Sequence, residues 1–266
     1  MNNISKSYLS ELLKKDQRMD GRKLDEYRKI SIETGISKNA EGSARVKLGD
    51  TEVIVGIKME VGTPYPESPD EGTIIVNTEM LPMANPDFES GPPSVESIEL
   101  ARVVDRGIRE SKLINFKGLC ITEGEEVWLV LIDIYTINDD GNLQDAAALA
   151  ALAALRDAKM PAYEDKKIDY DKKKDPLPLQ KETVETTFIK INDNIVVDPC
   201  LDEEKLLDAR LTVATTKEGI CALQKGGDNT FTIEDIDYIL KIAKKKGDEI
   251  RKLLKWNTQN MREQES

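Results

Sequence analysis

The stretch Asp139-Asp-Gly-Asn-Leu-Gln-Asp-Ala-Ala-Ala148 connects the two segments that predict the core of the fold. Val127 to Ile137 is an apolar run typical of a buried strand, and Ala146 to Ala158 is an alanine-rich run typical of a buried helix. A strand, a glycine turn and a helix start can bind an anion, because the first N–H groups of a helix lack helical partners. Here Asp145 would cap the helix and repel a phosphate, so we expect a phosphate-binding scaffold whose pocket is filled.

Both sides of this stretch carry the patterns of strands and helices. Alternating apolar residues predict strands, and Gly49-Asp50 predicts a hairpin turn. Helical spacing predicts an N-terminal amphipathic helix that docks through an apolar face of Ile4, Tyr8 and Leu12, with Leu9 and Leu13. The strands are expected at 29–36, 44–48, 52–61, 73–78, 183–191, 194–197, 209–216 and 219–224, with further helices at 95–112 and 232–254. Two halves that each run from strands to a helix indicate an α+β fold, with mainly antiparallel sheets and packed helices.

The same patterns divide the chain into segments. We expect an N-terminal helix and arm at 1–27, a first domain at 28–162, a charged linker at 163–182, a second domain at 183–256 and a flexible tail at 257–266. The linker is predicted from its alternating Lys and Asp residues and its two prolines, which favour an exposed segment.

Composition excludes several classes of function. The chain has 266 residues, a net charge of −12 and no histidine, which rules out His-based triads and zinc sites with histidine ligands. Its three cysteines, Cys120, Cys200 and Cys221, fit reduced core thiols better than a disulfide framework. No apolar run approaches the roughly 20 residues of a membrane helix and no signal peptide is evident, so we expect a cytoplasmic protein.

Three arginines are the candidate nucleic-acid contacts. Arg102, Arg106 and Arg109 follow at i, i+4 and i+7, which places them on one face of the expected helix. Arg binds phosphate through two donors, so such a face could follow the backbone of a single strand. The alternative is a solvated face whose arginines pair with acidic neighbours such as Glu99 and Asp105.

Several short motifs in a fixed order resemble the RNase PH family of phosphorolytic exoribonucleases. The resemblance extends from about Arg18 to about Lys252, and it is closest to the non-catalytic RNase PH-like subunit of the archaeal exosome ring. The motifs are Arg18-Met-Asp-Gly-Arg22, Gly42-Ser-Ala-Arg-Val46, Gly49-Asp-Thr-Glu-Val53, Glu99-Leu-Ala-Arg-Val-Val-Asp-Arg106 and Asp198-Pro199. For Arg22 and Arg45 within these motifs, ion pairing near strand starts is expected rather than RNA contact.

The active members of the family differ from this chain where chemistry occurs. They carry Asp-Gly-Gly-Thr-Arg-Thr/Ser-Ala-Ala at the phosphate turn, where this chain has Leu143, Gln144 and Asp145 in place of the threonine, the arginine and the hydroxyl. Of two catalytic aspartates six positions apart, Asp198 is kept and the second has become Glu204. For this second pair we expect a turn followed by an acidic, solvated segment.

The resemblance therefore implies a subunit with no catalytic residue, no metal site and no cofactor of its own. It implies an RNA-binding structural role in a hexameric ring, in which three heterodimers with a catalytic RNase PH-like partner degrade single-stranded RNA from 3′ to 5′. Inorganic phosphate would act at the partner's site, and RNA-binding cap proteins would be further partners. The alternatives are an active phosphate-dependent exoribonuclease that forms a homo-oligomer, and an acidic α+β scaffold with no role in RNA.

Overall fold

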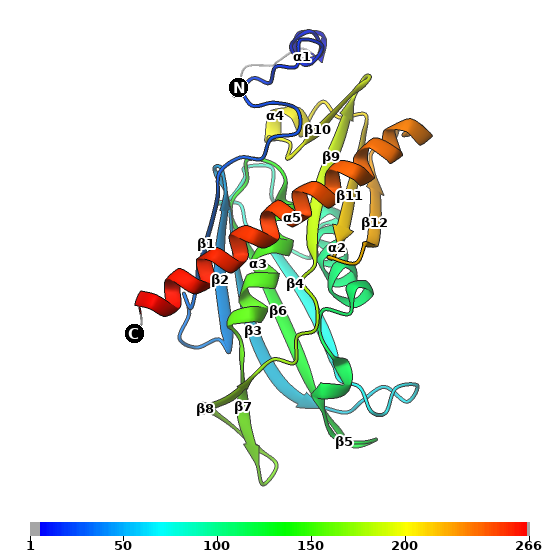
Figure 1. Cartoon of the computed structure of the whole chain (residues 1–266). Coiled ribbons are helices and arrows are strands. Elements are labelled where there is room, and N and C mark those ends of the chain that lie inside the picture. Colours follow the sequence, from blue (N-terminus) through cyan, green and yellow to red (C-terminus); the bar gives the residue numbers. More distant parts are fainter. Residues whose placement is uncertain (1–5, 265–266) are drawn as a thin grey trace.

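Two β-sheets enclose a layer of helices in the computed structural model (Figure 1), which describes the backbone of residues 6–264 and the side chains up to 254 except that of residue 174. The first sheet has the order β1-β2-β3-β6-β4, with β5 paired to β6. Its strands are β1 (Ile30–Thr34), β2 (Gly42–Leu48), β3 (Thr51–Gly62), β4 (Thr73–Met80), β5 (Cys120–Thr122) and β6 (Glu126–Asn138). Only the β4–β6 pair is parallel among the pairs of this sheet that the structure describes.

The second sheet is antiparallel throughout its described strands. Its order is β10 (Asn194–Val197), β9 (Val184–Ile191), β11 (Ala209–Thr215) and β12 (Ile220–Gly226). Helix α5 (Ile233–Gln264) covers its outer face, where Ile239 and Ala243 pack against Phe188 and Val213. The expected strands and helices of both halves are thus confirmed, and so is the α+β class.

Helix α3 (Leu143–Asp157) lies between the two sheets beside α2 (Val95–Ser111), and every residue of α3 from Leu143 to Leu155 is buried. A helix that is covered on all sides needs small residues, and its alanines allow strands to approach closely. A Cβ atom on Gly42 of β2 would lie 2.4 Å from the Ala154 carbonyl oxygen, so only glycine fits there. The alanine-rich run therefore allows α3 to pack closely on the first sheet.

The N-terminal helix α1 (Lys6–Leu13) docks on the second half, as its pattern predicted. Leu9 and Leu13 are buried against Ile189, Ile191 and Val196. Tyr8 of the predicted apolar face is exposed, and Ile4 lies outside the described residues.

The segment expected as a charged linker is not a plain connection. Its first part forms an antiparallel hairpin of β7 (Lys159–Glu164) and β8 (Lys167–Pro176), which projects from the body of the molecule (Figure 1). Asp165 and Lys166 form the two-residue turn with φ of 51° and 60°, the left-handed conformation that such turns require. The alternating Lys and Asp residues form a strand here, because most of β8 is exposed to water, whereas Pro161 and Ala162 of β7 are buried.

Two further expectations need correction. Residues 257–264, expected as part of a flexible tail, continue helix α5, whereas 265 and 266 lie outside the described residues. The sequence also predicts an apolar stripe on this helix that includes Ile250, Leu253 and Leu254. Ile250 and Leu254 are buried against the first half, but Leu253 is 44% exposed. Among the described residues, no helix combines the length and the apolar composition needed to cross a membrane.

Candidate functional site

The turn between β6 and α3 is closed by its own side chains. Asn142 adopts the left-handed conformation with φ of 57°, and its side chain accepts a hydrogen bond of 3.4 Å from the Asp145 N–H. The cap of α3 is therefore Asn142, and the prediction that Asp145 caps the helix is wrong. The side chain of a capping residue accepts from the N–H two or three positions later. Asp145 is therefore the third residue of the helix, within its first turn.

The N–H groups of this turn already have acceptors within the protein. The Asp140 N–H donates to Thr51 Oγ1 (3.1 Å), the Gly141 N–H to Asp139 Oδ1 (3.0 Å) and the Asn142 N–H to Glu204 Oε1 (2.9 Å). A Cβ atom on Gly141 would lie 2.5 Å from the Leu201 nitrogen, so the turn packs backbone to backbone on the second half. Three N–H groups of the turn that could contribute to phosphate binding are thus occupied by oxygen atoms of this chain.

Asp145 connects three parts of the molecule. It is 4% exposed, and its carboxylate accepts hydrogen bonds from Tyr27 Oη (2.6 Å), Asn142 Nδ2 (2.9 Å) and both the N–H and the hydroxyl of Thr187 on β9 (3.0 and 2.7 Å). Burial raises the pKa of Asp145 to about 6, although these donors favour its charged form. The carboxylate therefore acts as an acceptor that joins α3, β9 and the N-terminal arm.

Asp198, which corresponds to a catalytic aspartate in the family resemblance, is fully buried and paired. Its carboxylate accepts bonds from Arg22 Nη1 (2.8 Å), from the Arg28 N–H, Nε and Nη2 (2.8, 3.0 and 2.8 Å) and from Asn142 Nδ2 (2.8 Å). Arg28 also donates to the carbonyl oxygens of Asp140, Gly141 and Pro199. A carboxylate with this many donors is held as a fixed anion and has no free position for a substrate.

The segment after Asp198 is short helix α4 (Leu201–Glu204), and it is not the solvated acidic segment that we expected. Glu203 is 1% exposed and pairs with the equally buried Arg18. Glu204 is partly buried, and burial raises its pKa to about 7. Arg210 of β11 pairs with Glu99 of α2 at 2.8 Å.

The arrangement disfavours the binding of phosphate at this site. The carboxylates of Asp145, Asp198 and Glu204 surround the turn, and the nearby arginines are paired with them or with Glu99. A phosphate approaching the turn would meet like charge, without a free cation to offset it. No group of three or more Cys, Asp and Glu side chains in the described part of the chain has the arrangement of a metal site.

The three candidate RNA-binding arginines lie on α2 as predicted, but they differ in their contacts. The Arg109 guanidinium is occupied by contacts within the protein. It pairs with Asp105 (2.9 Å), donates to the Ile74 carbonyl oxygen (2.7 Å) and lies over the Phe116 ring. Arg106 has one long contact of 3.5 Å to Gln224 of β12. Arg102 is exposed and has no hydrogen bond or ion pair with any described residue. The alternative, in which the arginines pair with acidic neighbours, therefore holds for Arg109 but not for Arg102.

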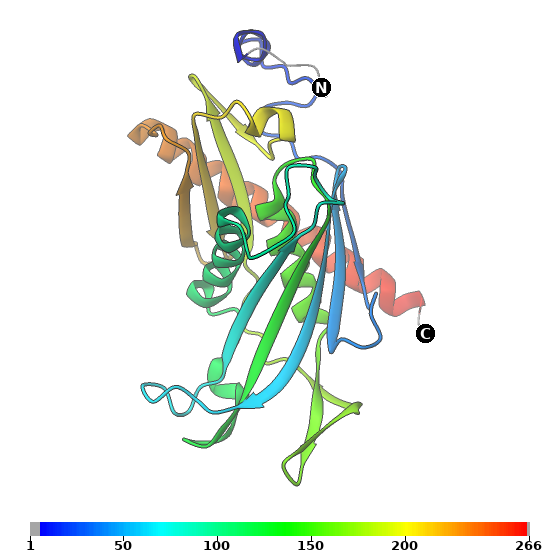
Figure 2. The same cartoon turned by 180° about the vertical axis from the view of Figure 1, so that it is seen from behind.

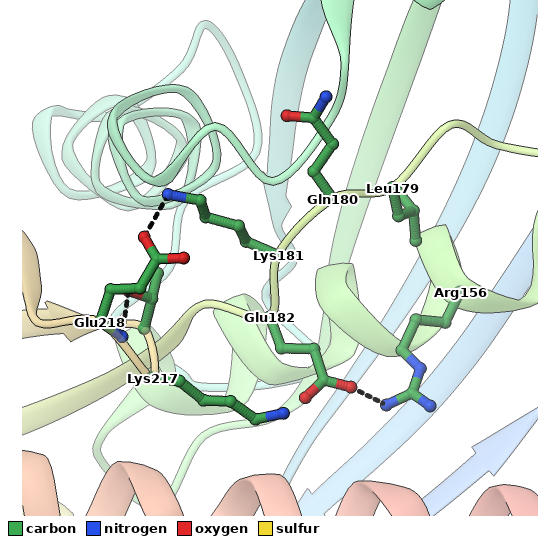
Figure 3. Close-up of a pocket in the computed structure, with 8 residues that line it drawn as sticks. Arg156, Leu179, Gln180, Lys181, Glu182, Lys217 and Glu218 are labelled. Atoms are coloured by element: carbon green, nitrogen blue, oxygen red, sulfur yellow. Dashed lines mark hydrogen bonds and ion pairs between the residues drawn. The ribbon is translucent and has the colours of Figure 1, made fainter.

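A cavity of about 320 Å³ lies at the end of α3 opposite to the turn (Figure 3). Its charged side chains largely neutralise one another, because Lys181 pairs with Glu218 (2.5 Å) and Arg156 with Glu182 (3.0 Å). The cavity lies far along α3 from the turn and shares no residue with it. We therefore assign the candidate site to the turn.

The arginines of two family motifs and the three cysteines also have contacts that bear on the sequence predictions. Arg22 and Arg45 form ion pairs as expected, the first with Asp20 and Asp198 and the second with Glu33 and Glu52. The three cysteines are free, but each is partly exposed and so none is a true core residue. Burial raises the pKa of the Cys200 thiol to about 12, which keeps it protonated and unreactive.

Several residues of the site were not identified from the sequence, among them Tyr27, Arg28, Asn142 and Thr187. Arg28 lies in a segment without a motif, and nothing in its neighbours indicates that it would reach Asp198, 170 positions away. Asn142 could have been recognised, because an Asn three positions before Asp145 has the spacing of a helix cap.

Known proteins match this chain over most of its length. The model of the 3′ exoribonuclease family matches with its domain 1 at residues 26–161 and with its domain 2 at residues 183–246. The exosome complex component Rrp42 of Methanothermobacter thermautotrophicus is 48% identical over 247 residues, which cover 91% of each chain. The protein of the same name from Methanocella arvoryzae is 47% identical and covers 94% of this chain and 95% of its own.

Solved structures agree with these relatives. A chain of the Archaeoglobus fulgidus exosome, solved with RNA bound to the active site, superposes with a TM-score of 0.87 at 44% identity, covering 93% of this chain and 96% of that one. A chain of an archaeal exosome core superposes with a TM-score of 0.84 at 42% identity, covering 94% and 96%. Both domains of the family model, their order and the fold therefore coincide, and the chain belongs to the RNase PH family of 3′ exoribonucleases.

Proposed function

We propose that this chain is a non-catalytic subunit of an archaeal exosome ring that supports RNA degradation by a catalytic RNase PH-like partner. The observation that carries the proposal is the closed turn, in which Glu204 accepts from the Asn142 N–H and Asn142 bonds both Asp145 and Asp198. Its relatives named as exosome components support the assembly. In this proposal the partner binds inorganic phosphate, three heterodimers form the ring, and cap proteins bring RNA to it.

The isolated chain is expected to release no nucleoside diphosphate from RNA in the presence of phosphate. The reason is that the carboxylates at the turn repel phosphate, and that Asp139 and Glu204 already accept from the N–H groups of Gly141 and Asn142. Nucleotide release should be measured with the pure chain and with the chain reconstituted with a catalytic RNase PH-like partner. Turnover by the pure chain would favour the alternative, an active homo-oligomeric exoribonuclease, and would refute the proposed role.

We also propose that Arg102, Arg106 and Arg109 contribute to RNA binding by the assembled ring. Arg102 and Arg106 are expected to carry the phosphate contacts, since Arg109 is held by Asp105 and Ile74. Each phosphate contact with a single strand contributes about 0.7 to the slope of log affinity against log salt. Replacing Arg102 and Arg106 together by alanine should therefore flatten this slope by up to about 1.4.

The effect should be similar for RNAs of different sequence, because phosphate contacts do not read bases. Lys225→Ala on the neighbouring strand β12 removes an exposed cation outside the α2 face and serves as the matched control. RNA binding should be titrated at several salt concentrations with rings of verified size. An intact double-variant ring with the slope of the control would show that the α2 face is only solvated.

A further inference from the structure

Strand β4 is the outer strand of the first sheet, and its far edge is unpaired among the described residues (Figure 2). In a parallel pair, the N–H and C=O of one residue point to the same side, and those of the next residue point to the other. The Glu79 carbonyl oxygen accepts from Thr136 Oγ1 of β6, whereas the Ile74 carbonyl oxygen accepts from Arg109 of α2. The main-chain groups of Val76 and Thr78 therefore point outward.

Strand β4 lacks the sequence features that usually protect an exposed edge, although Arg109 of α2 covers its outward carbonyl oxygen at Ile74. Natural sheets protect edge strands with lysine, proline, bulges or short length. Strand β4 has eight residues without lysine or proline, and its pairing with β6 has no irregularity. The other end of this sheet is the five-residue strand β1, and the projecting β8 carries several lysines. An unprotected edge of this length is a template for another strand.

A groove of about 380 Å³ follows this edge between β4 and the first turns of α2. Thr78 Oγ1 is buried in it without a hydrogen-bond partner, although a buried hydroxyl normally has one. Apolar side chains lie on both sides of the edge, with Ile98 57% exposed, and Ile75 and Tyr135 each 42% exposed. The groove thus combines free main-chain groups, an unsatisfied hydroxyl and exposed apolar surface.

The charges along the groove are acidic. Glu79 on β4 and Asp133 on β6 line it, and Asp133 is held in place by Asn77 Nδ2 at 3.0 Å. No Lys or Arg is among its lining residues in the described structure. An occupant with lysine or arginine side chains would complement these carboxylates and fix its register along the edge.

We propose that an extended segment of a partner chain, bearing apolar and basic side chains, adds a strand to the free edge of β4. The proposal rests on the proposed function, because a ring subunit must bind its neighbours through lateral surfaces. The added strand would pair with the main chain of Val76 and Thr78, and one basic side chain would lie opposite Glu79 and Asp133. Edge addition of this kind derives affinity from the main chain and specificity from alternate side chains.

The test uses two variants of the full chain, each co-expressed with the RNase PH-like partner. Val76→Pro removes an outward N–H without removing a bond to β6, and proline is tolerated at such edge positions. Glu79→Lys reverses the charge and leaves the backbone intact. Each variant is expected to weaken association by about tenfold or more, as measured by light scattering or native mass spectrometry across a dilution series.

Glu60→Lys on β3 is the matched control, because Glu60 is also exposed on the first sheet but does not line the groove. The control should assemble like the unaltered chain. Normal assembly by Glu79→Lys, or by a correctly folded Val76→Pro, would overturn the inference and leave the proposed function standing. Failure of the unaltered chain to assemble with any such partner would overturn both.

Discussion

Replacing Arg28 by alanine is expected to lower the free energy of unfolding by about 3–5 kcal/mol, the cost of removing one partner of a buried ion pair. The Arg28 side chain is 8% exposed, and Asp198, to which it donates three hydrogen bonds, has no exposed surface. Alanine would retain only the main-chain bond, and would also leave the carbonyl oxygens of Asp140, Gly141 and Pro199 without this donor. Arg22 would still pair with Asp198, but through a single side-chain contact.

Denaturant unfolding should be compared with that of Arg45→Ala. Arg45 also forms two ion pairs, with Glu33 and Glu52, but its side chain is 36% exposed. Exposed pairs contribute about 0–1 kcal/mol, so this control should change stability little. Equal losses for the two variants would contradict the view that burial makes the Arg28–Asp198 pair important.

Stability is expected to decrease as pH rises from about 4 to about 7. Burial raises the folded-state pKa of Asp145 to about 6 and that of Glu204 to about 7, and it also raises the pKa of Glu185, to which the Asp145 charge adds. Between the unfolded and the folded pKa, the folded state binds more protons than the unfolded state. The contribution of these three carboxyl groups to stability is therefore fully present below about pH 4 and is lost as pH rises through their folded pKa values.

Glu204→Gln tests this pH dependence. Glutamine keeps an oxygen that can accept from the Asn142 N–H, but it does not ionise. Between pH 5 and 7, the free energy of unfolding should fall less steeply in the variant than in the parent, by about 1.4 kcal/mol per pH unit. At pH 8 the variant should be more stable than the parent by up to roughly 3 kcal/mol. Unfolding should be measured at pH 5, 6, 7 and 8, with Glu110→Gln on the exposed side of α2 as control. A variant with the parent's slope would show that Glu204 does not contribute.

The sequence predicted those elements whose burial pattern is regular. Strands β3 and β6 alternate or run apolar, and the alanines from 146 to 154 predict a helix that is covered on all sides. The β2–β3 hairpin followed from Gly49-Asp50, since a two-residue turn between alternating segments has few other conformations. Local periodicity was sufficient in each of these cases.

The remaining features depend on contacts between distant residues or on patterns with two explanations. The β7–β8 hairpin has charged residues on both faces, so its alternation resembles a solvated linker. Arg28 pairs with a residue in the other half of the chain, which no local pattern indicates. The arginines of α2 share one face in sequence, but only the structure separates the paired Arg109 from the unpaired Arg102.

The closed turn also bears on how this subunit could have diverged, and on whether a laboratory could reverse the change. Asn142 bonds two carboxylates and gives its N–H to a third, so each side chain in the group depends on the others. Changing Asp145 alone to serine would remove the acceptor of Tyr27 and Thr187, and changing Asn142 alone would deprive Asp198 of a donor. A single step back at Asp145 or at Asn142 thus passes through a less stable protein. Recovery of catalysis would require several simultaneous substitutions, and ordinary mutational drift is expected to preserve the inactive state.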